Sequence, residues 1–270
     1  MKVLIVYHVG LASDAKSLFS EYAKQGIDLS VILPEKIIGG EGYAPEGFTF
    51  DKQSSKENYK IFPVALKNPK NYGAGFKFFQ LFAAIKMIKP DVIYVLDEYT
   101  SFYLSQVILC RNMLYGRKVP VICYAFQNVA SFFKSPKMVF TSPARFVKRI
   151  MRKIAQPTLF LFHKKYLDGV MACNNEAIEN ITNAGAKMPK EKIFWGVDFA
   201  KFYPKDKARC REQLGMLPNV KLIGYVGRII EEKGVDEALQ AARNLSEYHL
   251  AFVGIGEHEV RLKKLASDLG

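Results

Sequence analysis

Two cations lie close together in the sequence where an apolar run passes into a segment with helical spacing. In the stretch GYVGRIIEEKGVDEAL (224–239), Arg228 and Lys233 are five positions apart. Arginine can hold a phosphate through two parallel hydrogen bonds, and lysine adds a movable point charge. The start of the following helix adds amide donors and a partial positive charge, so the group can stabilise a diphosphate leaving group without a metal. The spacing leaves a second interpretation open, in which the loop is solvated and both cations pair with Glu231 and Glu232.

Other motifs for phosphate binding or nucleophilic catalysis do not occur in the sequence. The first loop has one glycine, Gly10, and lacks GxGxxG; GIGEHEV (254–260) lacks the third glycine; GRIIEEKG lacks the spacing of a nucleoside-triphosphate loop. No Ser-His-Asp or Cys-His arrangement shows in the spacing. The four cysteines form no CxxC pair and none has a histidine at metal-ligand spacing, which predicts no metal site and reduced thiols in a cytosolic protein.

Strand-like and helical segments alternate along the chain, and the strand-like segments are continuously apolar. The expected strands are 2–7, 28–34, 59–66, 91–96, 119–126, 169–174, 220–227 and 248–254. The expected helices are 13–25, 76–88, 100–115, 206–214, 235–244 and 257–269. One more helix is expected to be capped by Asn174 or Asn175 and to end at 184. This pattern predicts an α/β fold with doubly wound parallel sheets covered by helices on both faces. The crossing segment FWGVDFAKFYP (194–204) predicts a division into residues 1–196 and 197–270.

Several polar or glycine-bearing loops follow the expected strands. They are His8-Val9-Gly10, Asp97-Glu98, Gln127-Asn128, Asn174-Asn175, Gly227-Arg228 and Gly254-Ile255-Gly256. Because ligands of parallel sheets bind beyond the carboxyl ends of the strands, we expect these loops to face a cleft between the two halves.

The stretches GYVGRIIEEKGVDEAL and LAFVGIGEHEVRLKKLASDLG strongly resemble family 4 glycosyltransferases (glycosyl transferases group 1), which have the GT-B fold. WGVDFAKFYP resembles the junction between the two domains of that family. The resemblance implies two Rossmann-like domains facing a cleft, with 1–196 on the acceptor side and 197–270 as the first part of the donor-binding domain. The family's carboxylate pair is expected beyond residue 270, so we expect a truncated second domain and a fragment that can be inactive alone.

The resemblance also assigns roles to residues of this sequence. Arg228 and Lys233 are expected to grip the donor's diphosphate, Gly10 to let the first loop approach the donor, and Gly254 and Gly256 to line the nucleotide side. The family retains anomeric configuration and usually needs no metal or other cofactor, and a nucleotide-diphosphate sugar is its co-substrate. The departing diphosphate receives the acceptor's proton, so the cations neutralise charge that grows in the transition state.

One departure from the family pattern concerns the loop after 119–126, where many members keep a histidine and this chain has FQN. We therefore expect Gln127 and Asn128 to orient substrate by hydrogen bonding, with Glu98 beside them on the acceptor side. The alternative is that Glu98 caps the next helix and Asn128 fixes a turn.

The charge of the chain is concentrated in one segment. The net charge is +13, and residues 99–167 hold twelve basic residues and no acidic one. Within PARFVKRIMRKIA (143–155), one helical face is apolar and the other carries Arg145, Lys148, Arg149, Arg152 and Lys153. Such a helix suits an anionic membrane surface, at roughly 1 kcal/mol per basic residue. The alternative is a helix that packs on its own domain; nucleic acid is disfavoured, because no recognised module accompanies the charge.

These observations together predict a retaining glycosyltransferase of the hexosyltransferase class. It would transfer a sugar from a nucleotide sugar to a lipid-linked or cell-envelope glycan acceptor, as a cytoplasmic protein peripheral to the inner face of the cytoplasmic membrane. Two alternatives stay open at this point: a sugar-nucleotide epimerase of the same fold, and a non-catalytic fragment that binds membranes or polyanions.

Overall fold

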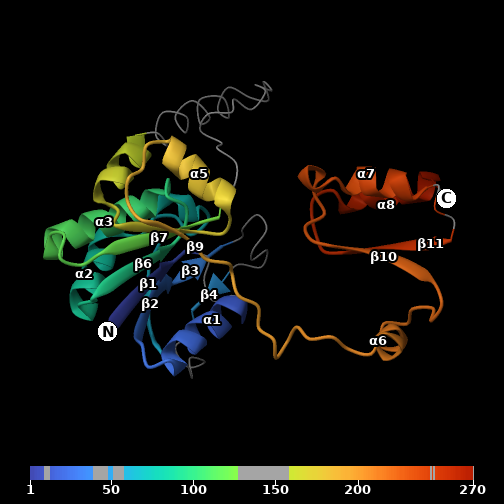
Figure 1. Cartoon of the computed structure of the whole chain (residues 1–270), viewed down its shortest axis with the longest axis horizontal. Coiled ribbons are helices and arrows are strands. Elements are labelled where there is room, and N and C mark those ends of the chain that lie inside the picture. The colour runs from blue at the N-terminus through green and yellow to red at the C-terminus, as the bar shows by residue number, and fades with distance from the viewer. Residues whose placement is uncertain are drawn as a thin grey trace. The chain divides into compact units, whose positions relative to one another are not determined.

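A computed structural model describes residues 1–8, 13–38, 48–50, 58–126, 158–243, 245 and 247–269. The chain divides into two compact units, Met1–Asp198 and Phe199–Gly270 (Figure 1). Among the described residues, no helix is both long and apolar enough to cross a membrane. The roles predicted for the two parts of the chain, acceptor side and donor side, stay predictions.

The first unit is built on a seven-stranded sheet whose neighbouring strands all run parallel. Its strands are β1 (Lys2–Tyr7), β2 (Asp28–Pro34), β5 (Lys60–Val64), β6 (Val92–Leu96), β7 (Val121–Ala125), β8 (Gly169–Ala172) and β9 (Lys190–Lys192), in the order β5-β2-β1-β6-β7-β8-β9. The chain moves outward from β1 to β2 and β5, and then continues on the other side of β1 with β6. The strand order therefore reverses between β1 and β6, which is where sheets of this kind bind ligands.

Helices cover both faces of this sheet, as the alternation in the sequence predicts. One face packs on α1 (Ser13–Lys24), whose Ala15 and Phe19 join the buried side chains of β1 and β2. The other face packs on α2 (Phe78–Ile88), α3 (Phe102–Tyr115), the helical residues 158–166 and α5 (Asn175–Asn183). Residues of the strands alternate between these two cores, because successive side chains of a strand point to opposite faces.

The second unit is smaller and has its own core. It contains α6 (Lys207–Gln213), β10 (Lys221–Val226), the short 3-10 helix η3 (Glu231–Lys233), α7 (Val235–Ala242), β11 (Tyr248–Val253) and α8 (Glu259–Leu269). Strands β10 and β11 pair in parallel, and α7 and α8 lie on one face of them (Figure 1). Ile229, Val235 and Leu262 form the buried centre of this unit.

The structure confirms the predicted strands and helices, with small shifts at their ends. Helix α2 begins at Phe78 rather than 76, because Phe76 forms an isolated antiparallel bridge with Leu66. Of the two candidates for the cap of α5, Asn174 is the one that accepts a hydrogen bond from the Ala177 amide, at 2.8 Å. Between β2 and β5, β3 (Lys36–Ile37) and β4 (Phe48–Thr49) pair in antiparallel fashion.

Candidate functional site

The loop that carries Arg228 is anchored in the core of the second unit. Ile229 is only 4% exposed and packs against Val235 and Leu262. The hydroxyl of Tyr225 donates a hydrogen bond of 2.7 Å to the Arg228 carbonyl. The backbone on both sides of the Arg228 side chain is therefore fixed, although the side chain itself is exposed.

Lys233 lies at the end of η3, immediately before α7. Gly234 follows it in the left-handed conformation, with φ of 66°, and its carbonyl accepts from the Ala238 amide at 2.9 Å. Glycine adopts this conformation without the steric penalty of other residues. Arg228 precedes η3 and Lys233 ends it, so both cations lie in the segment that leads into the amino terminus of α7; the binding of an anion there stays a prediction.

Neither cation is neutralised by a neighbour within the described part of the chain. No carboxylate there, including those of Glu231 and Glu232, lies within 4.0 Å of the charged nitrogens of Arg228 or Lys233. The interpretation in which these charges pair with the two glutamates is therefore not observed. Both side chains are exposed and available to an anion.

Gly254 and Gly256 lie directly against the loop that carries Arg228. A Cβ added to Gly254 would be 1.8 Å from the Gly227 carbonyl oxygen, and one added to Gly256 would be 2.0 Å from the Ile229 carbonyl oxygen. Hydrogen bonds of 3.0 Å from Gly227 to Val253 and 2.9 Å from Ile229 to Ile255 join the two loops. Both glycines are therefore required for backbone packing, and their contact with a nucleotide stays a prediction.

A second polar cluster lies in the first unit, where the strand order reverses between β1 and β6. His8 and Asp97 directly follow these two strands, whose last residues, Tyr7 and Leu96, are register partners. The Tyr103 hydroxyl lies 2.5 Å from His8 Nδ1 and donates to the Leu96 carbonyl at 3.2 Å. Burial lowers the pKa of His8, against the opposing charge of Asp97, and raises the pKa of Tyr103 well above its usual value. The pair is neutral at physiological pH.

Glu98 joins the ends of β6 and β7. Its Oε1 accepts a hydrogen bond of 2.8 Å from the Phe126 amide. The cap of α3 is Ser101, whose hydroxyl accepts from the Leu104 amide at 3.3 Å. The alternative in which Glu98 caps that helix is therefore wrong, and the carboxylate instead fixes the backbone directly before Gln127.

Several predicted residues lie outside the described part of the chain. They are Gly10, Gln127, Asn128, Arg145, Lys148, Arg149, Arg152 and Lys153. Their roles in donor approach, acceptor binding and membrane contact stay predictions, as does the alternative of a turn at Asn128.

His163 fixes the backbone that directly follows Glu98, and no motif in the sequence indicates this role. It is 1% exposed; its Nδ1 donates to the Tyr99 carbonyl at 2.7 Å, and its Nε2 accepts from the Ser105 hydroxyl at 2.7 Å. A carbonyl can only accept, so the proton of the neutral ring is on Nδ1. Burial lowers the pKa of His163 to about 4. Its only signal in the sequence is one histidine on the apolar side of LFHKKY.

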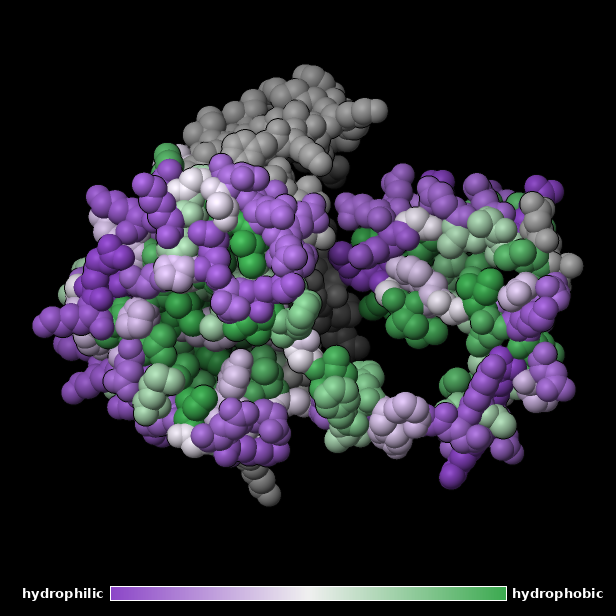
Figure 2. Space-filling model, viewed as in Figure 1, coloured by the Kyte–Doolittle hydropathy of each residue, from purple (hydrophilic) through white to green (hydrophobic). Residues whose placement is uncertain are grey.

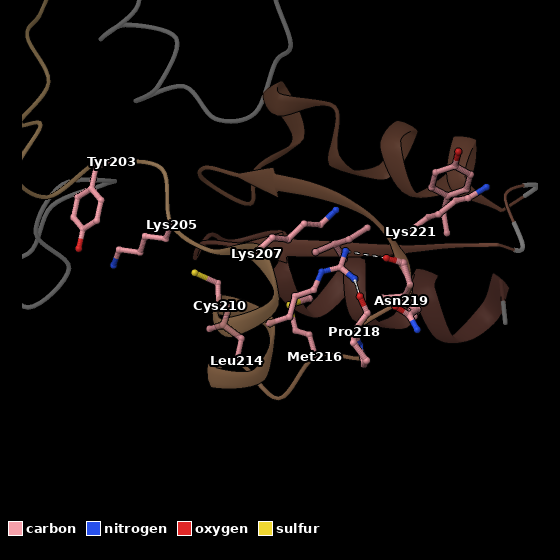
Figure 3. Close-up of a pocket in the computed structure, with 13 residues that line it drawn as sticks. Tyr203, Lys205, Lys207, Cys210, Leu214, Met216, Pro218, Asn219 and Lys221 are labelled. Carbon is pink, nitrogen blue, oxygen red and sulfur yellow. Dashed lines mark hydrogen bonds between the residues drawn. The ribbon is translucent and has the colours of Figure 1, made fainter.

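A groove of 1010 Å³ in the second unit lies at the other end of β10 from Arg228 (Figure 3). It is lined by α6, the turn that follows it and the first residues of β10. Arg211 is 8% exposed and donates to the carbonyls of Pro218 at 2.5 Å and Val220 at 2.8 Å. The guanidinium therefore stabilises the turn before β10, and the groove lies beside the start of that strand, whereas Arg228 follows its end.

Comparison with known proteins supports the family assignment in the second unit. Residues 206–270 match the model of the family Glycosyl transferases group 1. A segment of 59 residues is 41% identical to D-inositol 3-phosphate glycosyltransferase from Mycolicibacterium gilvum, and covers 22% of this chain and 13% of that protein.

Solved structures resemble the whole chain. Sucrose-phosphate synthase from Thermosynechococcus elongatus superposes with a TM-score of 0.67 at 12% identity, over 100% of this chain and 68% of the other. HepE from Anabaena, solved in complex with UDP, gives 0.62 at 14% identity, over 100% and 66%. The chain thus spans about two thirds of the length of these structures. The chain has the GT-B type fold, and its residues 206–270 match the family Glycosyl transferases group 1.

Proposed function

We propose that the protein is a retaining glycosyltransferase that transfers a sugar from a nucleotide-diphosphate sugar to a lipid-linked or cell-envelope glycan acceptor. The observation that carries the proposal is the Arg228 loop. Its backbone is fixed by Ile229 and Tyr225, while its two cations are exposed and have no carboxylate partner among the described residues. This loop lies inside the segment that matches the family model.

On the donor side, the proposed work of the chain is electrostatic. Arg228 and Lys233 would hold the diphosphate, and the amino terminus of α7 adds amide dipoles at the same turn. Negative charge on the diphosphate grows as the bond to the sugar breaks. Because the backbone that carries the cations is already fixed, their attraction for the diphosphate would increase in the transition state without reorganisation of the loop.

On the acceptor side, the proposal uses the cluster at the strand reversal. The Glu98 carboxylate is fixed by the Phe126 amide, and the turn behind it is fixed by His163. These groups position the ends of β6 and β7 for an acceptor hydroxyl. The departing diphosphate takes the proton of that hydroxyl, so no strong protein base is needed, and Gln127 and Asn128 complete the acceptor contacts.

The acceptor and the location belong to the same proposal. A lipid-linked acceptor requires that the enzyme work at a membrane surface. We assign the inner face of the cytoplasmic membrane, with Arg145, Lys148, Arg149, Arg152 and Lys153 as part of the contact. These residues lie outside the described part of the chain, and the support for them is their helical spacing in the sequence.

A panel of sugar nucleotides tests the function. The chain is incubated with UDP-, GDP- and ADP-linked sugars, with and without a lipid extract as acceptor, and the products are followed by NMR. We expect release of nucleoside diphosphate from one donor, faster with lipid, and a product that keeps the anomeric configuration of the donor. An epimerised sugar nucleotide formed without acceptor would instead identify an epimerase. Saturable vesicle binding without turnover or nucleotide binding would identify a non-catalytic fragment.

A further inference from the structure

Three of the helical segments on one face of the large sheet, α2, α3 and residues 158–166, have apolar outer sides. Helices α2 and α3 and the helical residues 158–166 bury their inner sides in the same core. Their outer sides expose large apolar residues, which we call the apolar helix face: Phe79 (84% exposed), Met87 (66%), Phe102 (41%), Leu109 (44%), Met113 (64%) and Leu161 (57%). Hydrophobic side chains reach the surface of this unit in the space-filling view (Figure 2).

The composition of these helices differs from that of ordinary surface helices. An outer helix of a globular protein normally has a charged or polar stripe on its solvent side. In α2 and α3, the only charged residues are Lys86 and Arg111, and Arg111 is fully buried. A run of exposed apolar side chains over adjacent helices is the signature of an interaction surface.

The exposed charges at the ends of these three helices are mostly positive. Lys77, Lys86, Lys89, Lys118 and Lys165 are exposed at or near the ends of the three helices. Residues 58–90 and 99–167 contain no acidic residue. The acids that flank the helices are engaged elsewhere: Asp91 accepts from the Lys2 amide at 2.7 Å, and Asp168 pairs with Arg117 at 2.9 Å. The ends of these three helices are therefore predominantly cationic, and the exposed acids on this face of the sheet, Glu176 and Glu179, belong to α5.

We propose that the apolar helix face binds the surface of an anionic phospholipid bilayer. Phe, Leu and Met side chains can insert at the boundary between headgroups and acyl chains, while lysines contact the anionic headgroups. A protein partner of matching charge would need an acidic rim around an apolar centre, whereas an anionic bilayer offers both features everywhere on its surface. The inference deepens the proposed function, and rests on it, because it names the surface that would bring the enzyme to a lipid-linked acceptor.

The direction of the helices places this surface near the proposed acceptor site. In a parallel α/β unit each helix runs back antiparallel to its strands. Helices α2 and α3 therefore begin on the side where the strands end, so Phe79 and Phe102 lie toward the sheet edge that carries Glu98. A lipid-linked acceptor held at the bilayer would approach the sheet from this end.

Vesicle sedimentation tests the proposal, with phosphatidylcholine alone and with phosphatidylcholine containing one third phosphatidylglycerol. The double variant Phe79→Ser/Met113→Ser should bind the anionic vesicles at least tenfold more weakly than the wild type, because inserted side chains of this size each contribute about that much. The matched control is Phe199→Ser/Leu214→Ser, at residues that are 81% and 73% exposed in the second unit. The control should bind like the wild type.

Two further variants separate the sources of binding. Lys77→Gln/Lys86→Gln should weaken binding to anionic vesicles by about fivefold per lysine and leave neutral vesicles unaffected. A variant with Arg145→Gln, Lys148→Gln, Arg149→Gln, Arg152→Gln and Lys153→Gln removes only the charge predicted on the segment 143–155. If that variant alone loses vesicle binding and Phe79→Ser/Met113→Ser binds like the wild type, the apolar helix face is not the lipid contact.

Binding of the wild type to neither kind of vesicle would also overturn the proposal, and would favour a protein partner for this face. The measurement needs no donor or turnover. A chain that binds vesicles through Phe79 and Met113 but fails to bind any nucleoside diphosphate would therefore contradict the proposed function and leave the lipid-binding surface in place.

Discussion

Arg111 and Arg228 are the same residue type in opposite situations. Arg111 is fully buried, pairs with Asp168 at 3.1 Å and donates to the carbonyls of Val119 at 3.1 Å and Tyr166 at 2.5 Å. Arg228 is exposed, and its own carbonyl is held by Tyr225. In the first case the two terminal nitrogens of the guanidinium are paired inside the protein and join α3 to the segments at Val119 and Tyr166, while the buried Nε has no partner among the described residues. In the second it fixes the backbone and leaves the guanidinium open. The comparison separates two uses of arginine: Arg111 is paired inside the protein, whereas Arg228, which we propose to bind the donor, lies on a fixed backbone and has no carboxylate partner among the described residues.

The largest expected effect is the replacement of the buried arginine. Arg111→Met should lower the free energy of unfolding of the first unit by about 3 kcal/mol or more, because it leaves Asp168 half of its ion pairs and removes donors from two buried carbonyls. Arg228→Met is the matched variant, and should change stability by less than about 0.5 kcal/mol. Urea denaturation measures both. Equal losses for the two would show that Arg228 is as structural as Arg111.

A smaller expected effect is the pH dependence of stability that arises from the buried His163. The pKa of His163 in the folded protein is about 4, below the usual value of 6.5. Above pH 6.5 the ring is therefore neutral in both the folded and the unfolded protein, and its titration does not change the free energy of unfolding. Between pH 6.5 and 4 the unfolded chain takes up a proton that the folded protein does not, and stability falls by up to ~3 kcal/mol.

The variant His163→Asn isolates this contribution, since its amide can still donate to the Tyr99 carbonyl but does not titrate. The difference in unfolding free energy between wild type and His163→Asn should change over this window and be flat above it. A difference that does not vary with pH would show that His163 is not held neutral.

The smallest expected effect comes from the hydrogen bond between the Tyr225 hydroxyl and the Arg228 carbonyl. Tyr225→Phe removes the hydroxyl that donates to the Arg228 carbonyl, while the ring keeps its contact with Phe252. Loss of one such hydrogen bond should cost about 1 kcal/mol, seen as a severalfold weaker affinity for nucleoside diphosphate in calorimetric titration. Phe252→Leu is the control for ring packing. Unchanged affinity in Tyr225→Phe would mean that the carbonyl bond does not position the cation.

The local features of the fold could be predicted from the sequence because they depend on near neighbours. Continuous apolar runs marked the strands of the parallel sheet, and Asn174 and Asn175 marked the two possible caps of α5, of which the structure shows Asn174. The G-R to K-G spacing marked the exposed loop that carries Arg228 and Lys233, and the binding of an anion there stays a prediction. Features that join distant segments could not be predicted. Ser105 and His163 are 58 positions apart, and no periodicity shows that they meet.

The glycines illustrate the same limit. The resemblance implies that Gly254 and Gly256 line the nucleotide side, which stays a prediction. The structure adds that the backbone of Gly227 and Ile229 occupies the space that a side chain at these positions would need. The two loops are 27 positions apart in sequence, counted from Gly227 to Gly254. Only the register of β10 with β11 brings them together.

The most direct test of the account is a titration of the chain with the nucleoside diphosphate of its preferred donor. The variant Arg228→Ala/Lys233→Ala is compared with Arg209→Ala/Lys264→Ala, which removes two exposed cations from the same unit. Charge-assisted hydrogen bonds contribute about 1.5 to 3 kcal/mol each, so the first variant should bind at least about a hundredfold more weakly, and the second should bind within about twofold of the wild type. Equal affinities for wild type and Arg228→Ala/Lys233→Ala would contradict the assignment of this loop to the donor diphosphate.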